Sequence, residues 1–341
     1  MFVYAETQRS RKSGFQVSRA WSAFSIGNEC TFGAATSLEV CYDALMFISY
    51  YRDLEFEYGR SDRVTPLVRR VVARNPSPFT FHGTGTYIVG HGNVAVIDPG
   101  PLDADHLKAL EQALEGETVT HILVTHTHRD HSPAAAPLKE ATGAPTFAFG
   151  PHGTPHGGPG VEEGADHAFL PDEVTADGAM IHGDGWTMEA VHTPGHTSNH
   201  LCYALREEKA LFSGDHVMGW STTVVSQPDG DMADYMASLA KVLGRDERVM
   251  IPTHGPPITD PAEYVTALLN HRQDRETQIL ACLAAGPMRI SQMVVVMYTD
   301  VPTHLHKAAG RSVHSHLIKM VQESRVISEG TPSADAVYTL P

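Results

Sequence analysis

Three histidines and one aspartate lie within six residues of one another, and no other feature constrains the fold and chemistry of this chain as much. They are His126, His128, Asp130 and His131, and they closely follow the apolar, β-prone stretch 121–124. Side chains two positions apart in a strand point to the same side, so His126 and His128 can converge on one ion where the strand ends. Asp130 and His131 follow where the chain turns, and they can face a second ion nearby. Neutral imidazole with carboxylate is the ligand set of borderline divalent metals, zinc above all, so the run predicts a metal centre.

Three single residues elsewhere have the same setting, because each stands beside a glycine or proline at the expected end of a strand. They are His196 in the segment TPGH, Asp215 in SGD and His254 in PTHGP. A strand end holds a side chain rigidly, while the loop that follows leaves a bound ion accessible. We therefore count these three residues among the candidate metal ligands.

Between about residue 64 and residue 260, strand patterns alternate with helix patterns, which predicts a layered α/β core. Leucines on one face and a glycine after the end predict a helix over 103–114. A second helix is expected over 132–142, with Ser132 as its N-cap and Pro133 at its first position, and a third over 231–243. Strands are expected at 86–89, 94–98, 119–124, 145–149, 201–205, 210–213 and 249–251, with short strand segments around 168, 179–182 and 186–193.

The two ends of the chain differ from this central pattern. Residues 1–60 begin with a segment rich in Arg and Ser, and the apolar stretch 38–58 has no clear helical period. We expect residues 1–60 to be a removable extension outside the core, and the main domain to occupy residues 61–260. From residue 261 the apolar spacing becomes helical. Three helices and a small hairpin there predict a winged-helix-like domain over 261–341.

Charge and cysteine content narrow the classes of function. The formal net charge is −15, so the surface does not attract phosphate backbones, which disfavours a nucleic-acid partner. The 4 cysteines are too far apart for a CxxC metal knuckle and too few for a disulfide framework, which favours a reducing, cytoplasmic setting. No apolar run approaches the roughly 20 residues that a membrane-spanning helix needs, so we expect no membrane association.

The motifs HxHxDH, TPGH, SGDH and THG, in this order, resemble the metallo-β-lactamase superfamily, and the resemblance covers residues 62–258. The segments 214–225 (GDHVMGWSTTVV) and 228–232 (PDGDM), with a C-terminal winged helix, look like its β-lactamase-like-protein-2 subgroup. That subgroup includes an organellar endoribonuclease, polyketide thioesterases and many bacterial hydrolases without an assigned substrate. The resemblance implies a four-layer αββα sandwich followed by a small winged-helix domain.

Carried over residue by residue, the resemblance implies two Zn²⁺ ions. Each would keep an open position, which is the arrangement of a catalytic site rather than a structural one. Asp215 offers a hard oxygen where some lactamases of the superfamily have cysteine, so Mn²⁺ and iron are alternatives to zinc. The first ion would be held by His126, His128 and His196, the second by Asp130, His131 and His254, and Asp215 would bridge both.

Other residues are expected to support this centre. Asp98, at the end of the strand 94–98, matches the aspartate with which the family orients a ligand histidine, with a turn-capping aspartate as the alternative. Trp220, Ser221 and Thr222 follow Asp215 and are candidates for lining the mouth of the site, with simple loop packing as the alternative.

Four further histidines have weaker patterns. His152 and His156 lie in a loop rich in glycine and proline, so we expect both to be solvated. His200 and His216 are expected to support the ligands or to pack beside them rather than to bind metal.

The activity that the resemblance implies is that of a dinuclear zinc hydrolase, in which a hydroxide bridging the two ions attacks the substrate. Asp130 would hold this hydroxide in line and pass its proton to the leaving group. The acidic surface favours a small acyl substrate: a thioester, a lactone or a related ester. A single-strand endoribonuclease of the same fold is an alternative that the subgroup alone suggests.

An alternative of another class is a ligand-sensing regulator that binds DNA through the winged helix. The expected recognition helix, 310–324, offers only Arg311, Lys319 and two histidines, whereas DNA readers have a denser basic face. We therefore expect the winged helix to serve as a lid or as the contact of a homodimer.

Overall fold

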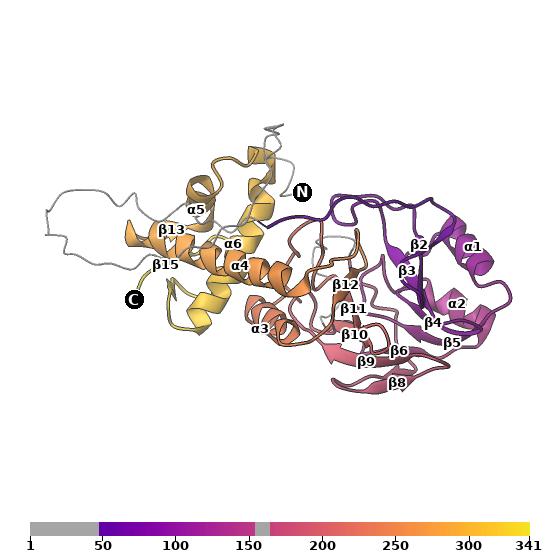
Figure 1. The fold of residues 1–341 in the computed structure, drawn as a ribbon. Coiled ribbons are helices and arrows are strands. Elements are labelled where there is room, and N and C mark those ends of the chain that lie inside the picture. Colours follow the sequence, from indigo (N-terminus) through magenta and orange to yellow (C-terminus); the bar gives the residue numbers. More distant parts are fainter. Residues whose placement is uncertain (1–47, 154–163) are drawn as a thin grey trace, which may run out of the picture.

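The structure is a computed structural model that describes residues 48–153 and 164–341. Within these residues, a seven-stranded sheet and a five-stranded sheet lie face to face, and helices cover the outer side of each sheet, as Figure 1 shows. This arrangement confirms the expected four-layer αββα sandwich.

The first sheet has its strands in chain order and is covered on its outer side by two helices. Its strands are β1 (Ser61–Arg63), β2 (Val68–Val72), β3 (Gly85–Val89), β4 (Asn93–Ile97), β5 (Thr118–Leu123), β6 (Thr146–Ala148) and β7 (Glu173–Val174). In β4, Val94 and Val96 pack against the helices, while Ala95 and Ile97 pack against the second sheet. This alternation follows the two-residue period of a strand, and it explains why both faces of the sheet are apolar.

The second sheet has the order β12-β11-β10-β9-β8. Its strands are β8 (Met180–His182), β9 (Thr187–His192), β10 (Leu201–Leu205), β11 (Ala210–Gly214) and β12 (Val249–Pro252). β11 and β12 are parallel, so their carboxyl ends meet at one edge. The amide of Leu201 donates to Thr125 O at 2.7 Å, and the amide of Gly85 donates to Thr253 O at 2.8 Å. These bonds join the sheets where β5 and β12 end.

The helices of the sandwich are α1 (Ala104–Ala113), α2 (Ala135–Thr142), α3 (Met232–Leu243) and α4 (Pro261–Ala284). α1 and α3 begin as expected, because the carboxylates of Asp103 and Asp231 accept hydrogen bonds from the amides of their first turns. α2 begins at Ala135, so the expectation that Ser132 is its N-cap is wrong. The Ser132 hydroxyl instead donates to Asp166 Oδ2 at 2.7 Å.

Residues 48–60 do not lie outside the core, contrary to our expectation for the N-terminal extension. Ile48 is buried in the core between the second sheet and its helices. The amide of Tyr51 donates to Gly219 O at 2.9 Å, and the Tyr51 ring packs edge-on against Tyr264 of α4. Burial of apolar side chains lowers the free energy of the folded state, so these contacts hold the segment against the sandwich. Residues 1–47 lie outside the described part of the chain.

The C-terminal module consists of the second half of α4 with three further helical segments and a small sheet of order β13-β15-β14. These elements are β13 (Met288–Arg289), α5 (Ile290–Met297), the 3-10 helix η1 (Thr303–Leu305), α6 (His306–Gln322), β14 (Ile327–Ser328) and β15 (Val337–Thr339). Figure 1 shows α4 running from the sandwich into this module. Tyr264 and Leu268 of α4 pack in the core of the sandwich, whereas Ile279 and Leu283 pack in that of the module. One helix thus joins the two cores. No helix in residues 48–153 and 164–341 is long and apolar enough to cross a membrane.

Candidate metal centre

The seven candidate ligands come together at the edge where β5, β11 and β12 end. Their donor atoms form three groups, and within each group all the atoms lie within 4.8 Å of one another. The groups are His126–His128–His196, His126–His131–Asp215 and Asp130–His131–His254. The second group shares a histidine with each of the others. The three groups therefore form one continuous cluster of seven possible metal ligands.

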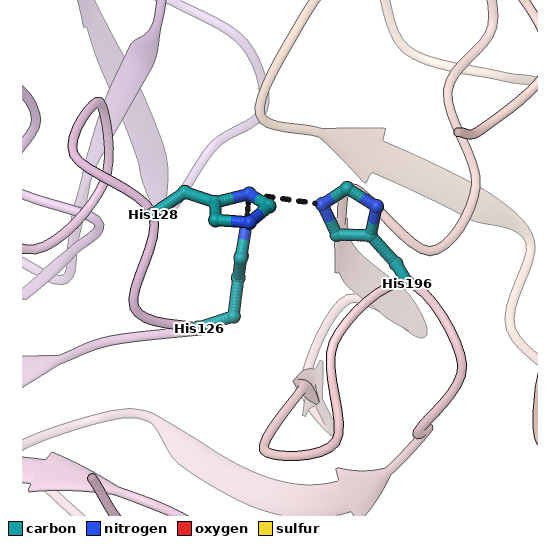
Figure 2. A group of neighbouring side chains, drawn as sticks. All are labelled: His126, His128 and His196. Atoms are coloured by element: carbon teal, nitrogen blue, oxygen red, sulfur yellow. Dashed lines mark hydrogen bonds between the residues drawn. The ribbon is translucent and has the colours of Figure 1, made fainter. Parts of the chain in front are cut away.

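The first group consists of three imidazoles, which Figure 2 shows pointing toward one another from two loops. The Nδ1 atom of His128 lies 3.0 Å from Nε2 of His126 and 3.2 Å from Nε2 of His196. Burial, with the neighbouring imidazoles, lowers the pKa of His128 to about 3, and it lowers the pKa of His126 and His196 as well. All three rings are therefore neutral at physiological pH, which is the form that binds metal.

The third group combines a carboxylate with two imidazoles. Oδ2 of Asp130 lies 3.1 Å from Nε2 of His254 and 3.4 Å from Nε2 of His131. Burial alone would lower the pKa of both imidazoles, but the carboxylates of Asp215 and Asp130 outweigh this effect. They raise the pKa of His254 to about 10 and raise that of His131 as well. In the metal-free protein these imidazoles balance the charge of the carboxylates, a role that a bound cation would take over.

Asp215 lies between the first group and the third. Its Oδ2 is 3.6 Å from Nε2 of both His131 and His196, and its Oδ1 is 3.4 Å from Nε2 of His254. In the described part of the chain, Asp215 Oδ1 and His131 Nε2 are buried without a hydrogen-bond partner. Such atoms are rare in folded proteins, and here they face other donor atoms of the centre. The imidazoles and carboxylates of the three groups thus fit borderline divalent cations.

Asp98 holds His131 in place. Its Oδ2 accepts hydrogen bonds from His131 Nδ1 at 2.9 Å, from Thr125 Oγ1 at 2.8 Å and from Thr253 Oγ1 at 2.8 Å. A bond from Nδ1 leaves Nε2 of His131 facing the centre. Sequence reasoning missed the two threonines, although each directly precedes a candidate ligand, His126 or His254.

Backbone carbonyls orient two other histidines. Nδ1 of His196 donates to Val224 O at 2.8 Å, and Nδ1 of His254 donates to Gly83 O at 3.2 Å. In both rings this leaves Nε2 for the centre. A backbone acceptor has no sequence signature, so these two supports could not be anticipated.

His200 supports Asp215 through the backbone. Its Nε2 accepts a hydrogen bond from the amide of Asp215 at 3.1 Å, and its Nδ1 lies 2.9 Å from Thr193 Oγ1. Gly214 has a φ of +52°, and a Cβ atom there would lie 2.5 Å from His200 Nε2. Glycine is therefore required directly before Asp215. His216 is buried beside Tyr235, with ring centroids 5.2 Å apart, and belongs to none of the three groups.

His152 differs from the expectation, because its side chain is only 5% exposed. Its Nδ1 lies 3.0 Å from Thr127 Oγ1, and its ring centroid lies 6.3 Å from that of His128. The loop is held against the site by Asn199, whose amide donates to Gly150 O and Pro151 O. The expectation that His152 is solvated is therefore wrong. His156 lies outside the described residues.

Trp220 and Ser221 are buried, whereas Thr222 is partly exposed. The Trp220 ring stacks on Phe81 with centroids 5.0 Å apart, and the Ser221 hydroxyl donates to Thr222 O. These contacts pack Trp220 against Phe81 and tie Ser221 to its own loop.

Comparisons with known proteins agree with this fold. Residues 80–254 match the model of the metallo-beta-lactamase superfamily, and residues 290–335 match that of the beta-lactamase associated winged helix domain. The crystal structure of a beta-lactamase domain protein from Burkholderia ambifaria has a TM-score of 0.70 and 20% sequence identity, covering 85% of this chain and 96% of that one.

Two curated relatives show the same family. A beta-lactamase-like protein 2 homolog from Drosophila melanogaster is 33% identical over 295 residues, which cover 81% of this chain and 95% of the relative. An atrochrysone carboxyl ACP thioesterase from Claviceps purpurea is 32% identical over 249 residues, which cover 72% of this chain and 74% of the relative. The chain therefore belongs to the metallo-beta-lactamase superfamily, and it is a hydrolase of that superfamily with a C-terminal winged helix.

Proposed function

We propose that this hydrolase binds two Zn²⁺ ions and cleaves a small acyl substrate: a thioester, a lactone or a related ester. The observation that carries the proposal is the position of Asp215, whose two oxygens lie within 3.6 Å of imidazole nitrogens from both outer groups. Two bound ions would lower the pKa of a water molecule and polarise the acyl carbonyl. Mn²⁺ and iron are alternatives that the same oxygen ligands accept.

Asp130 is the residue that we propose to handle the proton. Burial raises the pKa of its carboxyl group, but His131 and His254 outweigh that effect and lower the pKa, so the group stays ionised at neutral pH. Its Oδ2 accepts a hydrogen bond from Thr84 Oγ1 at 3.3 Å, and Asn75 Nδ2 donates to the same hydroxyl at 3.0 Å. A carboxylate fixed in this way can accept a proton from the attacking water and return it to the leaving group.

The substrate class is supported by charge and by a relative. With a formal net charge of −15, the chain lacks the long-range attraction that a nucleic-acid backbone requires. The relative from Claviceps purpurea is named a thioesterase, and thioesters are among the substrates that we propose.

The surroundings of α6 argue against the DNA-binding alternative. Lys319 is buried and donates to Glu276 Oε1 at 2.8 Å, and His316 is buried beside the same carboxylate. His314 is half-buried, so Arg311 and, at the start of α6, Lys307 are the exposed cations of the helix. A helix with so few exposed cations cannot neutralise many phosphates.

The test is a panel of substrates assayed with zinc-loaded protein: thioesters, lactones, β-lactams and single-stranded RNA. We expect hydrolysis of a thioester or lactone by the unaltered protein, and its loss in Asp215→Ala. The control is His182→Ala, because His182 is exposed on β8 and belongs to none of the three donor groups. Cleavage of RNA without acyl hydrolysis would contradict the substrate class. Full activity of Asp215→Ala would contradict the metal site.

A further inference from the structure

Helices α4 and α6 contact a short piece of chain beside the metal centre, residues 223–225, which follow the candidate ligand Asp215. We propose that Arg272 of α4 and Ser315 of α6 are positioning residues for His196, and that they act by holding this 223–225 segment. The inference rests on the proposed metal site and assigns a role in it to α4 and α6.

The contacts lie on both sides of the carbonyl that orients His196. Nη2 of Arg272 donates to Thr223 O at 2.6 Å, and Oγ of Ser315 donates to Val225 O at 2.8 Å. The carbonyl between them, Val224 O, accepts the hydrogen bond from His196 Nδ1 at 2.8 Å. Arg272 and Ser315 therefore fix the neighbours of the one group that sets the direction of the His196 ring.

The same segment also holds the backbone beside Asp215. Oγ1 of Thr223 lies 2.8 Å from Asp215 O and 3.1 Å from His216 O, and both carbonyls can accept its proton. Tyr235 OH donates to His216 O at 3.1 Å, and the Arg272 guanidinium lies over the Tyr235 ring at 5.1 Å. Arg272 thus contacts two residues, Thr223 and Tyr235, that in turn bond to the backbone carbonyls of Asp215 and His216.

The burial of Arg272 supports a role beyond packing. Its exposure is 3%, and no carboxylate in the described ranges forms an ion pair with it. Burying a charged group without a counter-charge is unfavourable, and an apolar side chain would fill the same space at lower cost. The hydrogen bond to Thr223 O and the contact with Tyr235 are what a guanidinium provides here and an apolar side chain does not.

The effect should be selective for one of the two metal positions. His131 and His254 are oriented by Asp98 and by Gly83 O, and neither of these partners belongs to the 223–225 segment. Thr223 contacts the backbone carbonyl of Asp215 and not its carboxylate, so loosening the segment should disturb most the position that His196 lines. Loss of an orienting partner typically lowers metal affinity by about 10- to 100-fold.

The variants that test this are Arg272→Met and Ser315→Ala, each with a conservative counterpart that keeps a donor, Arg272→Lys and Ser315→Thr. Matched controls are Arg275→Met on α4 and Ser312→Ala on α6, because in the described part of the chain neither side chain forms a hydrogen bond to the sandwich. Zinc dissociation constants are measured by competition with a chromophoric chelator. The absorption spectrum of the Co²⁺-loaded protein reports the geometry of each ion, and thermal unfolding of the metal-free form checks folding.

We expect Arg272→Met and Ser315→Ala to lower the affinity for one of the two zinc ions by about 10- to 100-fold and to change the Co²⁺ spectrum of that position. The affinity for the other ion should stay within about threefold of its value in the unaltered protein. Arg272→Lys and Ser315→Thr should keep most of the affinity, and the controls should match the unaltered protein. If Arg272→Met does not fold, the Ser315→Ala and Ser315→Thr pair decides the question.

Two results would overturn the inference. One is unchanged affinity for both ions in the folded variants. The other is an equal loss of affinity for both ions, in proportion to the loss of thermal stability, because a merely structural contact behaves in this way. Absence of zinc binding by the unaltered protein would instead overturn the proposed metal site itself, so the two failures are distinguishable.

Discussion

Asp98 shows how much of this site depends on a residue that belongs to none of the three donor groups. Its carboxylate is fully buried and accepts hydrogen bonds from Thr125, His131 and Thr253, including one from the Thr125 amide at 2.7 Å. Its φ is +47°, a left-handed backbone conformation that costs on the order of 1 kcal/mol for a residue other than glycine. The network that surrounds the carboxylate holds the residue in this conformation.

Asp98→Asn should lower the affinity for zinc by about 10- to 100-fold, because an amide nitrogen cannot accept the bonds that orient His131 and Thr253. The measurement is chelator competition on the metal-free protein. Asp105→Asn, an exposed substitution in the first turn of α1, is the control. Equal zinc affinities for Asp98→Asn, the control and the unaltered protein would contradict the role given to Asp98.

At the scale of elements, the ends of β5, β11 and β12 could be predicted because each combines an apolar stretch with a glycine, proline or histidine at its end. The ligand candidates at those ends were therefore found from sequence alone. The start of α2 could not be predicted, because the Ser132 hydroxyl has a partner 34 positions away, Asp166, that competes with capping. His152 was misjudged for a similar reason, since its partner Thr127 lies outside its own loop.

The supports of the site were the part that sequence reasoning missed. Arg272 and His254 reach backbone carbonyls, of Thr223 and Gly83, and any residue type supplies such an acceptor. The hydrophobic period and the composition of a segment indicate which helix or strand it forms. They do not indicate contacts between elements far apart in the chain, such as these. Only the three-dimensional arrangement shows them.

The pairing of α4 with α6 should depend on pH through Glu276. This carboxylate is buried, which raises its pKa, but His316, Lys319 and Arg325 outweigh that effect and lower the pKa to about 2 from the usual 4.5. A folded-state pKa below the unfolded one contributes stability above about pH 4.5, and that contribution is lost as the pH falls toward 2.

Glu276→Gln should therefore reduce the free energy of unfolding at neutral pH and flatten its decline between pH 4.5 and 2. Denaturant unfolding of the metal-free protein at several pH values measures both effects. Glu329→Gln, at an exposed position in the same module, serves as the comparison. Declines of equal steepness in the two variants would show that Glu276 does not carry this pH dependence.

At the scale of the whole molecule, the sandwich is completed by segments from outside the family-matched residues 80–254. Ile48 and Tyr51 precede that region, and the first half of α4 follows it, yet all of them pack in one core with the second sheet. The proposed division at residues 60 and 260 therefore separates parts that share a core.

Shortened proteins test this packing. A protein that starts at residue 48 keeps Ile48 and the Tyr51 contacts, whereas one that starts at residue 61 loses them along with Glu55 O, an acceptor for Arg70. We expect the second protein to be less stable than the first by about 3 kcal/mol, since deleting one large buried apolar side chain costs about 2 to 5 kcal/mol. Denaturant unfolding is the measurement, and equal midpoints would show that residues 48–60 are dispensable.

The most direct test of a dinuclear centre is the number of zinc ions bound per chain. Metal-free protein is loaded with excess zinc, unbound metal is removed by gel filtration, and zinc is measured by elemental analysis against protein concentration from amino-acid analysis. Because Asp215 lies between His196 on one side and His131 and His254 on the other, we expect two zinc ions per chain and loss of both in Asp215→Ala. One ion or none in the fully loaded, unaltered protein would contradict it.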